Sequence, residues 1–208
     1  MNKNETRKLL IATHNQGKLR EYRKILADLS IEVTDLKSEG ITVDVEETGQ
    51  TFAENAALKA SAYALMTGLW TWADDSGLEV DPLDGRPGVY SARYAGAGAS
   101  DAERCQHLLA ELQPLTDVDW TARFQCVIAF ARPLPTGQIQ LQNAAGSIEG
   151  IITPEPRGTE GFGYDPIFYI PEQGRTMAEL EPELKNSISH RANAAVEARR
   201  LLVASLSK

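Results

Sequence analysis

Three groups of residues in this 208-residue chain have the side chains that bind phosphate, metal ions or planar rings. The first group follows a short apolar run, residues 9–12, and comprises Thr13, His14, Asn15, Gln16, Gly17 and Lys18. If a helix starts here, the backbone N–H groups of its first turn are unpaired and point at the loop, at the positive end of the helix dipole. Lys18 adds a full charge. The segment is therefore either a phosphate-binding loop or an ordinary turn between a strand and a helix, and its glycine spacing is not that of a Walker motif.

The second group consists of two acidic pairs, Glu46-Glu47 and Asp74-Asp75. Neighbouring side chains in an extended chain point to opposite sides, so we expect one Glu and one Asp to reach a given site. Mg²⁺ is suited by one or two carboxylate ligands, with water and phosphate oxygens in its remaining coordination positions. The alternative is that Asp74 and Asp75 end a strand at residues 69–73 and begin a turn, because Asp, Ser and Gly all favour turns.

A predicted helix at residues 52–66 carries a further basic side chain. Thr51 and Glu54 have the Thr-x-x-Glu spacing of a capping box, and Gly68 suits the end of the helix. Asn55 and Lys59 are four residues apart and so share one helix face. Lys59 is placed either to reach a phosphate or to remain a solvated surface lysine.

The third group is aromatic and basic. It comprises Phe162, Gly163, Tyr164 and Asp165, followed by Lys185, His190 and Arg191. Exposed aromatic rings among glycines are surfaces on which a nucleobase stacks, and a carboxylate can accept a hydrogen bond from a base edge. The alternative is an aromatic strand that enters the core, as we expect for residues 167–169.

His190 and Arg191 lie where the last helix, predicted at residues 191–206, begins. Positive charges there oppose the helix dipole. A bound anion would reverse the sign of that penalty, so the position favours an anionic ligand; the alternative is that the helix begins later.

The elements that position these groups follow from apolar spacing. Residues 9–12 are expected as a buried strand and residues 19–29 as an amphipathic helix. Further strands are expected at 124–130, 138–142 and 146–152, a helix after the Ser100 capping box with Cys105 in the core, and a proline-rich loop at 153–158. The hairpin between 124–130 and 138–142 is antiparallel, so we predict an α/β fold with a mixed sheet in one domain, residues 1–208.

Composition excludes several classes of protein. The net charge of −8 argues against general nucleic-acid binding, which depends on many Lys and Arg contacts to phosphate. No apolar stretch approaches the roughly 20 residues of a membrane helix, and the apolar run after residues 1–8 is too short for a secretory signal. Cys105 and Cys126 lack the spacing of a metal site and do not suggest a disulfide framework. A cytoplasmic protein is expected.

Six motifs in order identify a resemblance that runs nearly end to end. They are residues 13–18, the Glu46-Glu47-Thr48-Gly49 stretch with Phe52, Glu54, Asn55 and Lys59, and the segments 73–78, 87–94, 161–166 and 189–191. The chain resembles the inosine/xanthosine triphosphate pyrophosphatase family. The resemblance implies a homodimer and an elongated mixed sheet flanked by helices, in two lobes with a central active-site cleft.

The resemblance also implies a role for each group. Residues 13–18 would hold the triphosphate, Glu47 and Asp75 would bind Mg²⁺, and Asp75 would serve as base. Lys59 and Ser76 would add phosphate contacts. The purine would be held by Phe162, Gly163, Tyr164, Asp165, Lys185, His190 and Arg191.

The implied reaction is hydrolysis of ITP, dITP or XTP to the monophosphate and pyrophosphate, which removes these nucleotides from the pool. His14 departs from the smaller residue common in the family, and we expect the loop to tolerate it. For Arg93 we expect buried structural pairing. Two other classes remain open: a module that binds a purine nucleotide without cleaving it and, least favoured by the charge, a nucleic-acid-binding protein.

Overall fold

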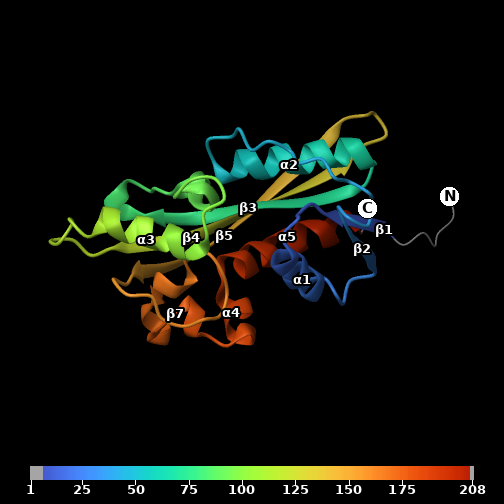
Figure 1. Ribbon diagram of the computed structural model, residues 1–208. Helices are drawn as coiled ribbons and strands as arrows, with labels where there is room; N and C mark the ends of the chain where they lie inside the picture. Colours follow the sequence, from blue (N-terminus) through green and yellow to red (C-terminus); the bar gives the residue numbers. More distant parts are fainter. Residues whose placement is uncertain (1–6, 207–208) are drawn as a thin grey trace. The chain divides into compact units, whose positions relative to one another are not determined.

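The computed structural model describes residues 7–206. Most of the N-terminal segment at residues 1–8, which we do not expect to belong to a secretory signal, lies outside the described residues. Figure 1 shows helices packed on a sheet. The strands are β1 (Arg7–Ile11), β2 (Ile31–Asp35), β3 (Trp70–Val80), β4 (Thr121–Pro133), β5 (Ile139–Ile152), β6 (Phe168–Ile170) and β7 (Arg175–Thr176). The α-helices are α1 (Gln16–Ile25), α2 (Phe52–Thr67), α3 (Asp101–Leu112), α4 (Pro182–Ile188) and α5 (His190–Leu206).

The seven strands form one open sheet in the order β2-β1-β3-β4-β5-β6-β7. β1 pairs in parallel with β2 and β3, whereas β6 pairs antiparallel with β5 and β7. The prediction of an α/β fold with a mixed sheet is therefore confirmed. By its contacts the chain divides into two compact units, one of residues 7–75, 127–145 and 194–206 and the other of residues 76–126 and 146–193.

The first unit packs helices on both faces of its part of the sheet. α2 lies on one side, and α1 and α5 lie on the other (Figure 1). Tyr22 of α1 stacks on Trp72 of β3, with ring centres 5.4 Å apart. α2 instead supplies small buried residues, Ala56, Ala60 and Ala64, which let the helix backbone approach the sheet closely.

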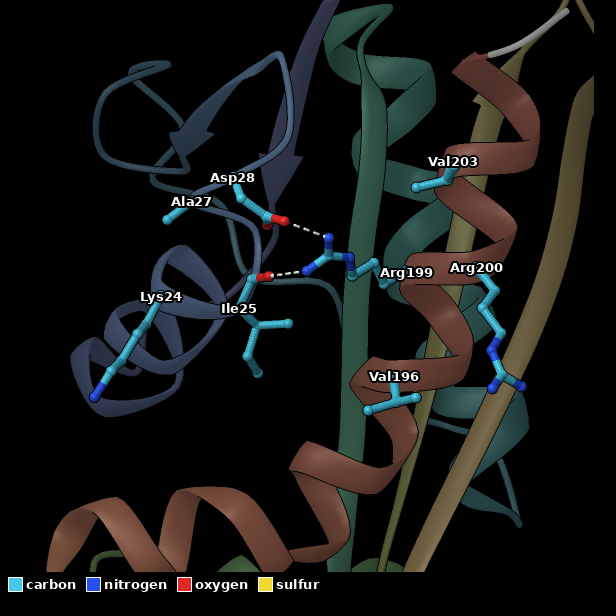
Figure 2. Close-up of a pocket in the computed structure, with 8 residues that line it drawn as sticks. All are labelled: Lys24, Ile25, Ala27, Asp28, Val196, Arg199, Arg200 and Val203. Atoms are coloured by element: carbon cyan, nitrogen blue, oxygen red, sulfur yellow. Dashed lines mark hydrogen bonds and ion pairs between the residues drawn. The ribbon is translucent and has the colours of Figure 1, made fainter.

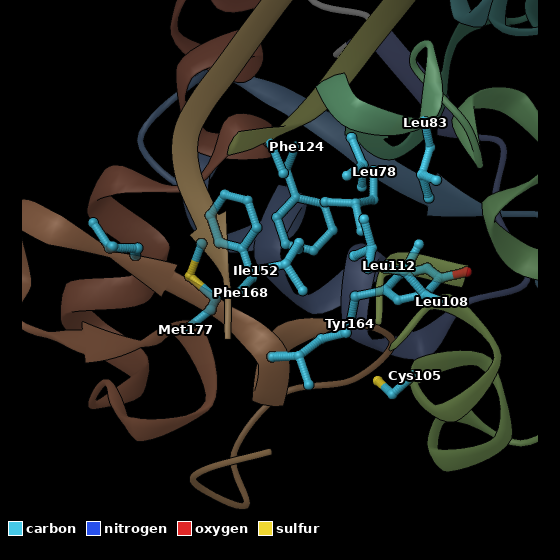
Figure 3. Close-up of a cluster of buried hydrophobic side chains, with 14 of the residues drawn as sticks. Leu78, Leu83, Cys105, Leu108, Leu112, Phe124, Ile152, Tyr164, Phe168 and Met177 are labelled. Carbon is cyan, nitrogen blue, oxygen red and sulfur yellow. The ribbon is translucent and has the colours of Figure 1, made fainter. Parts of the chain in front are cut away.

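The second unit has its own apolar core, shown in Figure 3. Leu108 and Leu112 of α3 are fully buried there, and the rings of Phe124 and Phe168 lie 4.5 Å apart. Cys105 is buried in the same core, as predicted, and burial raises the pKa of its thiol to about 11. Both cysteines are free thiols.

Helix ends follow the predicted caps. The capping boxes at Thr51 and Ser100 are both present, and Gly68 ends α2 with a left-handed φ of 68°. α1, however, occupies residues 16–25 rather than 19–29, because Asn15 caps it earlier. α5 begins at His190, so the alternative of a later start is wrong.

Two strands are longer than predicted. β5 joins the strands expected at 138–142 and 146–152 into one. β3 does not end before Asp74 but runs on to Val80, so the interpretation of Asp74 and Asp75 as a turn is wrong. Both carboxylates are buried in the middle of the strand, where basic side chains from neighbouring helices compensate their charge.

Asp35, at the end of β2, has a measurable role in stability. Its carboxylate accepts hydrogen bonds from the backbone and side chain of Ser38 and from Arg23, and these contacts, the Ser38 backbone first, lower its pKa below 3.8. We expect Asp35→Asn to lower the free energy of unfolding at pH 7 by about 1 kcal/mol. A depressed carboxyl pKa stabilises the fold above the ordinary pKa, so the difference from wild type should vanish as the pH falls through the folded value. Urea unfolding at pH 7 and pH 3 tests this; an equal difference at both would contradict it.

Among residues 7–206, no helix is long and apolar enough to cross a membrane.

Candidate active site

The predicted phosphate loop is a capped helix start. The side-chain oxygen of Asn15 accepts hydrogen bonds from the backbone N–H groups of Gly17 and Lys18, at 2.8 and 3.2 Å. The Thr13 hydroxyl in turn accepts from the Asn15 backbone at 3.1 Å. The expectation that the first-turn N–H groups are unpaired is thus wrong for two of them, because Asn15 satisfies them. What the loop offers an anion is the helix dipole and its exposed polar side chains.

His14 and Gln16 are exposed in this loop. The Nε2 of His14 lies 2.9 Å from a carboxylate oxygen of Asp44, and both side chains are at least half exposed. This contact belongs to the protein surface, in keeping with the expectation that the loop tolerates a histidine.

Lys18 forms an ion pair that sequence reasoning did not assign. Its Nζ lies 2.8 Å from Asp74 Oδ2, and the Asp74 side chain is only 2 % exposed. Trp70, Trp72 and Asp74 alternate along β3 and so share the sheet face that α1 covers. This alternation along β3 could have predicted the ion pair, because an acidic residue buried on the face that α1 covers needs a cation from α1.

Asp75 points to the opposite face, toward α2. Its Oδ2 accepts a hydrogen bond from Asn55 Nδ2 at 3.0 Å, and its Oδ1 lies 4.0 Å from Lys59 Nζ. Lys59 also forms an ion pair with Glu47. One carboxylate of each acidic pair therefore enters this cluster, as predicted, while Glu46 is exposed.

The charges in this cluster act on one another. Burial raises the pKa of Asp75, Lys59 lowers it and the nearby Glu47 raises it, with a net rise above 3.8. For Lys59, burial lowers the pKa, but the charges of Asp74, Asp75 and Glu47 outweigh it and raise the pKa. Asp75 is thus a carboxylate of increased basicity beside a lysine that stays charged.

The donor set of this cluster fits a divalent cation that needs few protein ligands. Glu47 and Asp75 are hard oxygen donors, and both lie beside Lys59. Within residues 7–206 no three His, Cys, Asp or Glu side chains form a group that could hold a metal. A cation here would therefore keep most of its coordination for water or substrate oxygens.

The second unit contains the aromatic and basic cluster. Phe162 is 41 % exposed, with Lys185 Nζ 5.3 Å and the Arg191 guanidinium 5.7 Å from its ring centre. Asp165 is buried, and its Oδ2 accepts from Lys185 and from the Phe162 backbone. Gly161 has a φ of +86°, and a Cβ there would lie 2.1 Å from Asp165 Oδ2, so the loop requires glycine.

Other predicted residues are placed differently. Tyr164 is buried and its hydroxyl donates to the Ser91 carbonyl, so its ring belongs to the core and offers no stacking face. His190 is buried with its ring stacked on Phe124 at 4.9 Å. The Gly163 backbone N–H donates to Asp101 of α3 at 2.7 Å. Ser76, half-buried, follows Asp75 in β3.

The expectation for Arg93 is wrong. Arg93 is exposed and lies over the Tyr90 ring at 5.0 Å, because its helical turn runs along the surface. Tyr94 instead accepts a hydrogen bond from Arg86 and packs edge-on against His107. Burial raises the pKa of Tyr94 to about 12, so the phenol stays neutral.

A hollow of about 710 Å³ lies between the C-terminal end of α1 and α5. Figure 2 shows Arg199 crossing it to the Ile25 carbonyl and Asp28, at 3.1 and 2.6 Å. Its lining combines four apolar residues, Val196 and Val203 among them, with four charged ones, and includes none of the predicted site residues. It lies at the other end of α1 from Lys18, and it offers no chemistry of its own.

The sheet and its helices define an α/β protein. Its site combines the cluster of Glu47, Lys59 and Asp75 with the capped start of α1, which carries Lys18. These acidic and basic groups suit a polyphosphate. The chain matches the model of the Ham1 family over residues 9–201 and belongs to that family. It is 49% identical over 188 residues to a dITP/XTP pyrophosphatase of Bacillus licheniformis, covering 90% of this chain and 94% of that protein. A dITP/XTP pyrophosphatase of Nostoc is 53% identical over 189 residues, 91% of each chain.

Solved structures agree in fold. A HAM1 protein from Coxiella burnetii superposes with a TM-score of 0.88 at 44% identity, over 95% of this chain and 99% of that chain. The Ham1 protein of Staphylococcus aureus gives 0.84 at 42% identity, over 96% and 100%. The resemblance inferred from six motifs is thereby confirmed.

Proposed function

We propose that this protein hydrolyses the non-standard purine nucleoside triphosphates ITP, dITP and XTP to the monophosphate and pyrophosphate. The observation that carries the proposal is the cluster of the buried Asp75 with the half-buried Lys59 and Glu47, in a chain about half identical to proteins named dITP/XTP pyrophosphatases. A protein that only binds nucleotides has no need of a Glu and an Asp paired beside one lysine.

The phosphate chain is held by the loop before α1 and by basic side chains of α1 and α2. Thr13, His14, Asn15, Gln16 and Gly17 present polar groups and the dipole of α1, while Lys18 and Lys59 supply fixed positive charge. Ser76 adds a hydroxyl contact. These groups act by positioning the triphosphate and by neutralising charge that grows on the departing pyrophosphate.

Asp75 acts as the base. Its carboxylate takes a proton from a water molecule as that water attacks the α-phosphorus. The new P–O bond forms while the bond from the α-phosphorus to the bridging oxygen breaks, and the electron pair leaves with pyrophosphate. A raised carboxyl pKa improves a base that must work near neutral pH.

Glu47 and Asp75 would hold Mg²⁺. When bound, the ion would supply charge neutralisation on the phosphate oxygens, in addition to that from Lys18 and Lys59.

The purine is held by the cluster around Phe162. Phe162 offers an exposed ring for stacking, and Lys185 and Arg191 are donors beside it. Donors suit the 6-oxo group of hypoxanthine and xanthine, whereas the 6-amino group of adenine would leave a donor facing donors. Asp165 fixes Lys185 and the Phe162 backbone in place; Gly163, Tyr164 and His190 shape the surrounding loop and helix start.

We also propose a cytoplasmic homodimer. The two buried free cysteines suit a reducing compartment. α2 leaves Leu58, Leu65 and Met66 exposed, an apolar surface suited to a second copy. Light scattering of the purified protein should give the mass of two chains.

The experiment that tests the function compares ITP, XTP, dGTP and ATP at equal concentration with Mg²⁺. The proposal predicts turnover of ITP and XTP with little of ATP, whose base carries the mismatched 6-amino group. dGTP has the same 6-oxo group with an added 2-amino group, so its rate measures discrimination at position 2 of the base. Tight binding of ITP without turnover would replace it with a nucleotide-binding module, and equal turnover of ATP would overturn the reasoning about the 6-oxo group.

A further inference from the structure

Asn55 is a fully buried polar side chain in the middle of the catalytic cluster. It lies in the first turn of α2 with 0 % of its surface exposed. A primary amide in such a position costs free energy unless its donors and acceptor are satisfied. The hydrogen-bond partners of Asn55 must therefore compensate the cost of burying its amide in a helix whose other buried residues are mainly apolar.

The amide joins two parts of the site. Its Oδ1 accepts a hydrogen bond from the Gly49 backbone N–H at 2.8 Å, and its Nδ2 donates to Asp75 Oδ2 at 3.0 Å. A backbone N–H can only donate and a carboxylate accepts, so both partners require the same orientation of the amide. Gly49 is two residues beyond Glu47, so Asn55 connects the segment that carries Glu47 to Asp75.

We propose that Asn55 is a positioning residue for the hydrolysis: it holds Oδ2 of Asp75 and the segment of Glu47 in one register, and so directs Oδ1 of Asp75 toward Lys59 and the substrate. The inference rests on the proposed function of this cluster. With Oδ2 occupied by the amide, the second oxygen is the one that lies 4.0 Å from Lys59 Nζ.

Gly49 is part of the same arrangement. A Cβ at this position would lie 2.7 Å from Asn55 Oδ1, 2.7 Å from Glu54 Cβ and 3.0 Å from the Asn55 backbone nitrogen. The backbone of Asn55 cannot retreat, because its N–H is bonded to the Thr51 carbonyl in the first turn of α2. Gly49→Ala would therefore push the amide away from Asp75 without removing any charged group.

A purely structural role makes a different prediction, and Tyr63 provides the comparison. Tyr63 is also a buried side chain of α2 that bonds to the same segment, through its hydroxyl and the Val43 carbonyl at 3.0 Å. Tyr63→Phe removes one tether of that segment but does not touch Asp75. If Asn55 only anchors the segment, substitution of Asn55 and Tyr63→Phe should lower kcat to a similar extent.

The test measures kcat and KM for ITP in wild type, Asn55→Leu, Gly49→Ala and Tyr63→Phe, with thermal unfolding of each. Asn55→Leu and Gly49→Ala should lower kcat about 10- to 100-fold, as outer hydrogen-bond partners of an active-site ligand typically do, with KM changed less than about threefold. Tyr63→Phe should keep kcat within about twofold of wild type, even where its melting temperature is lower.

A second arm combines Asn55→Leu with Asp75→Asn. Because Asn55 acts through Asp75, the double variant should be no slower than Asp75→Asn alone. Wild-type kcat in both Asn55→Leu and Gly49→Ala, an equal loss in Tyr63→Phe, or multiplied losses in the double variant would each overturn the inference. If Asn55→Leu fails to fold, Gly49→Ala carries the comparison. Absence of turnover in wild type would instead overturn the proposed function itself.

Discussion

Asp75→Asn should lose about 10²- to 10⁴-fold of kcat, the range by which general-base catalysis contributes. The side chain keeps its size and can still accept the hydrogen bond from Asn55, but it can no longer take a proton from water. Single-turnover assays with ITP measure the loss. Glu46→Gln, which neutralises an exposed carboxylate next to Glu47, is the matched control and should be as active as wild type.

The same variant should be at least as stable as wild type at pH 7. Because the folded protein raises the pKa of Asp75 above 3.8, it binds that proton more tightly than the unfolded chain does. The ionised carboxylate therefore lowers the free energy of unfolding above the folded pKa, and the neutral amide removes this cost. A kcat within about fivefold of wild type would remove Asp75 from the role of base, and a free energy of unfolding below that of wild type would contradict the stability prediction.

Lys18→Ala should lower kcat about 10²- to 10³-fold, the loss that follows removal of one preorganised group facing transition-state charge. The structure adds a second effect. The change removes the ammonium that compensates Asp74, whose carboxylate is buried, so it should also lower the free energy of unfolding by about 3 kcal/mol.

A paired variant separates the two effects. Lys18→Met with Asp74→Asn removes both charges, so most of the stability should return while kcat stays low. The measurements are urea unfolding and initial rates with ITP for the single and the paired variant. Recovery of kcat together with stability would show that Lys18 serves the fold rather than the reaction.

Local rules were sufficient to predict much of the fold. The capping boxes at Thr51 and Ser100, the left-handed Gly68 and the buried Cys105 all follow from spacing within one turn of helix. The alternation of side chains in an extended chain also predicted that one carboxylate of each acidic pair would reach a given site, and the two that lie beside Lys59 are Glu47 and Asp75.

The errors arise where partners come from distant parts of the chain. β3 was expected to stop at Asp74 because Asp, Ser and Gly favour turns, but Lys18 and Lys59, from two helices, make burial of both carboxylates possible. Tyr164 was grouped with Phe162 by sequence proximity, yet its hydroxyl finds the Ser91 carbonyl and its ring joins the core. Such contacts are set by tertiary packing, which no local pattern contains.

The central claim is that the cluster around Asp75 cleaves the bond between the α- and β-phosphates. The most direct test is to incubate the protein with ITP and Mg²⁺ in ¹⁸O-labelled water and to identify the products by mass spectrometry. The account predicts pyrophosphate and inosine monophosphate, with the label in the monophosphate. Inosine diphosphate and inorganic phosphate, or label in pyrophosphate, would contradict it.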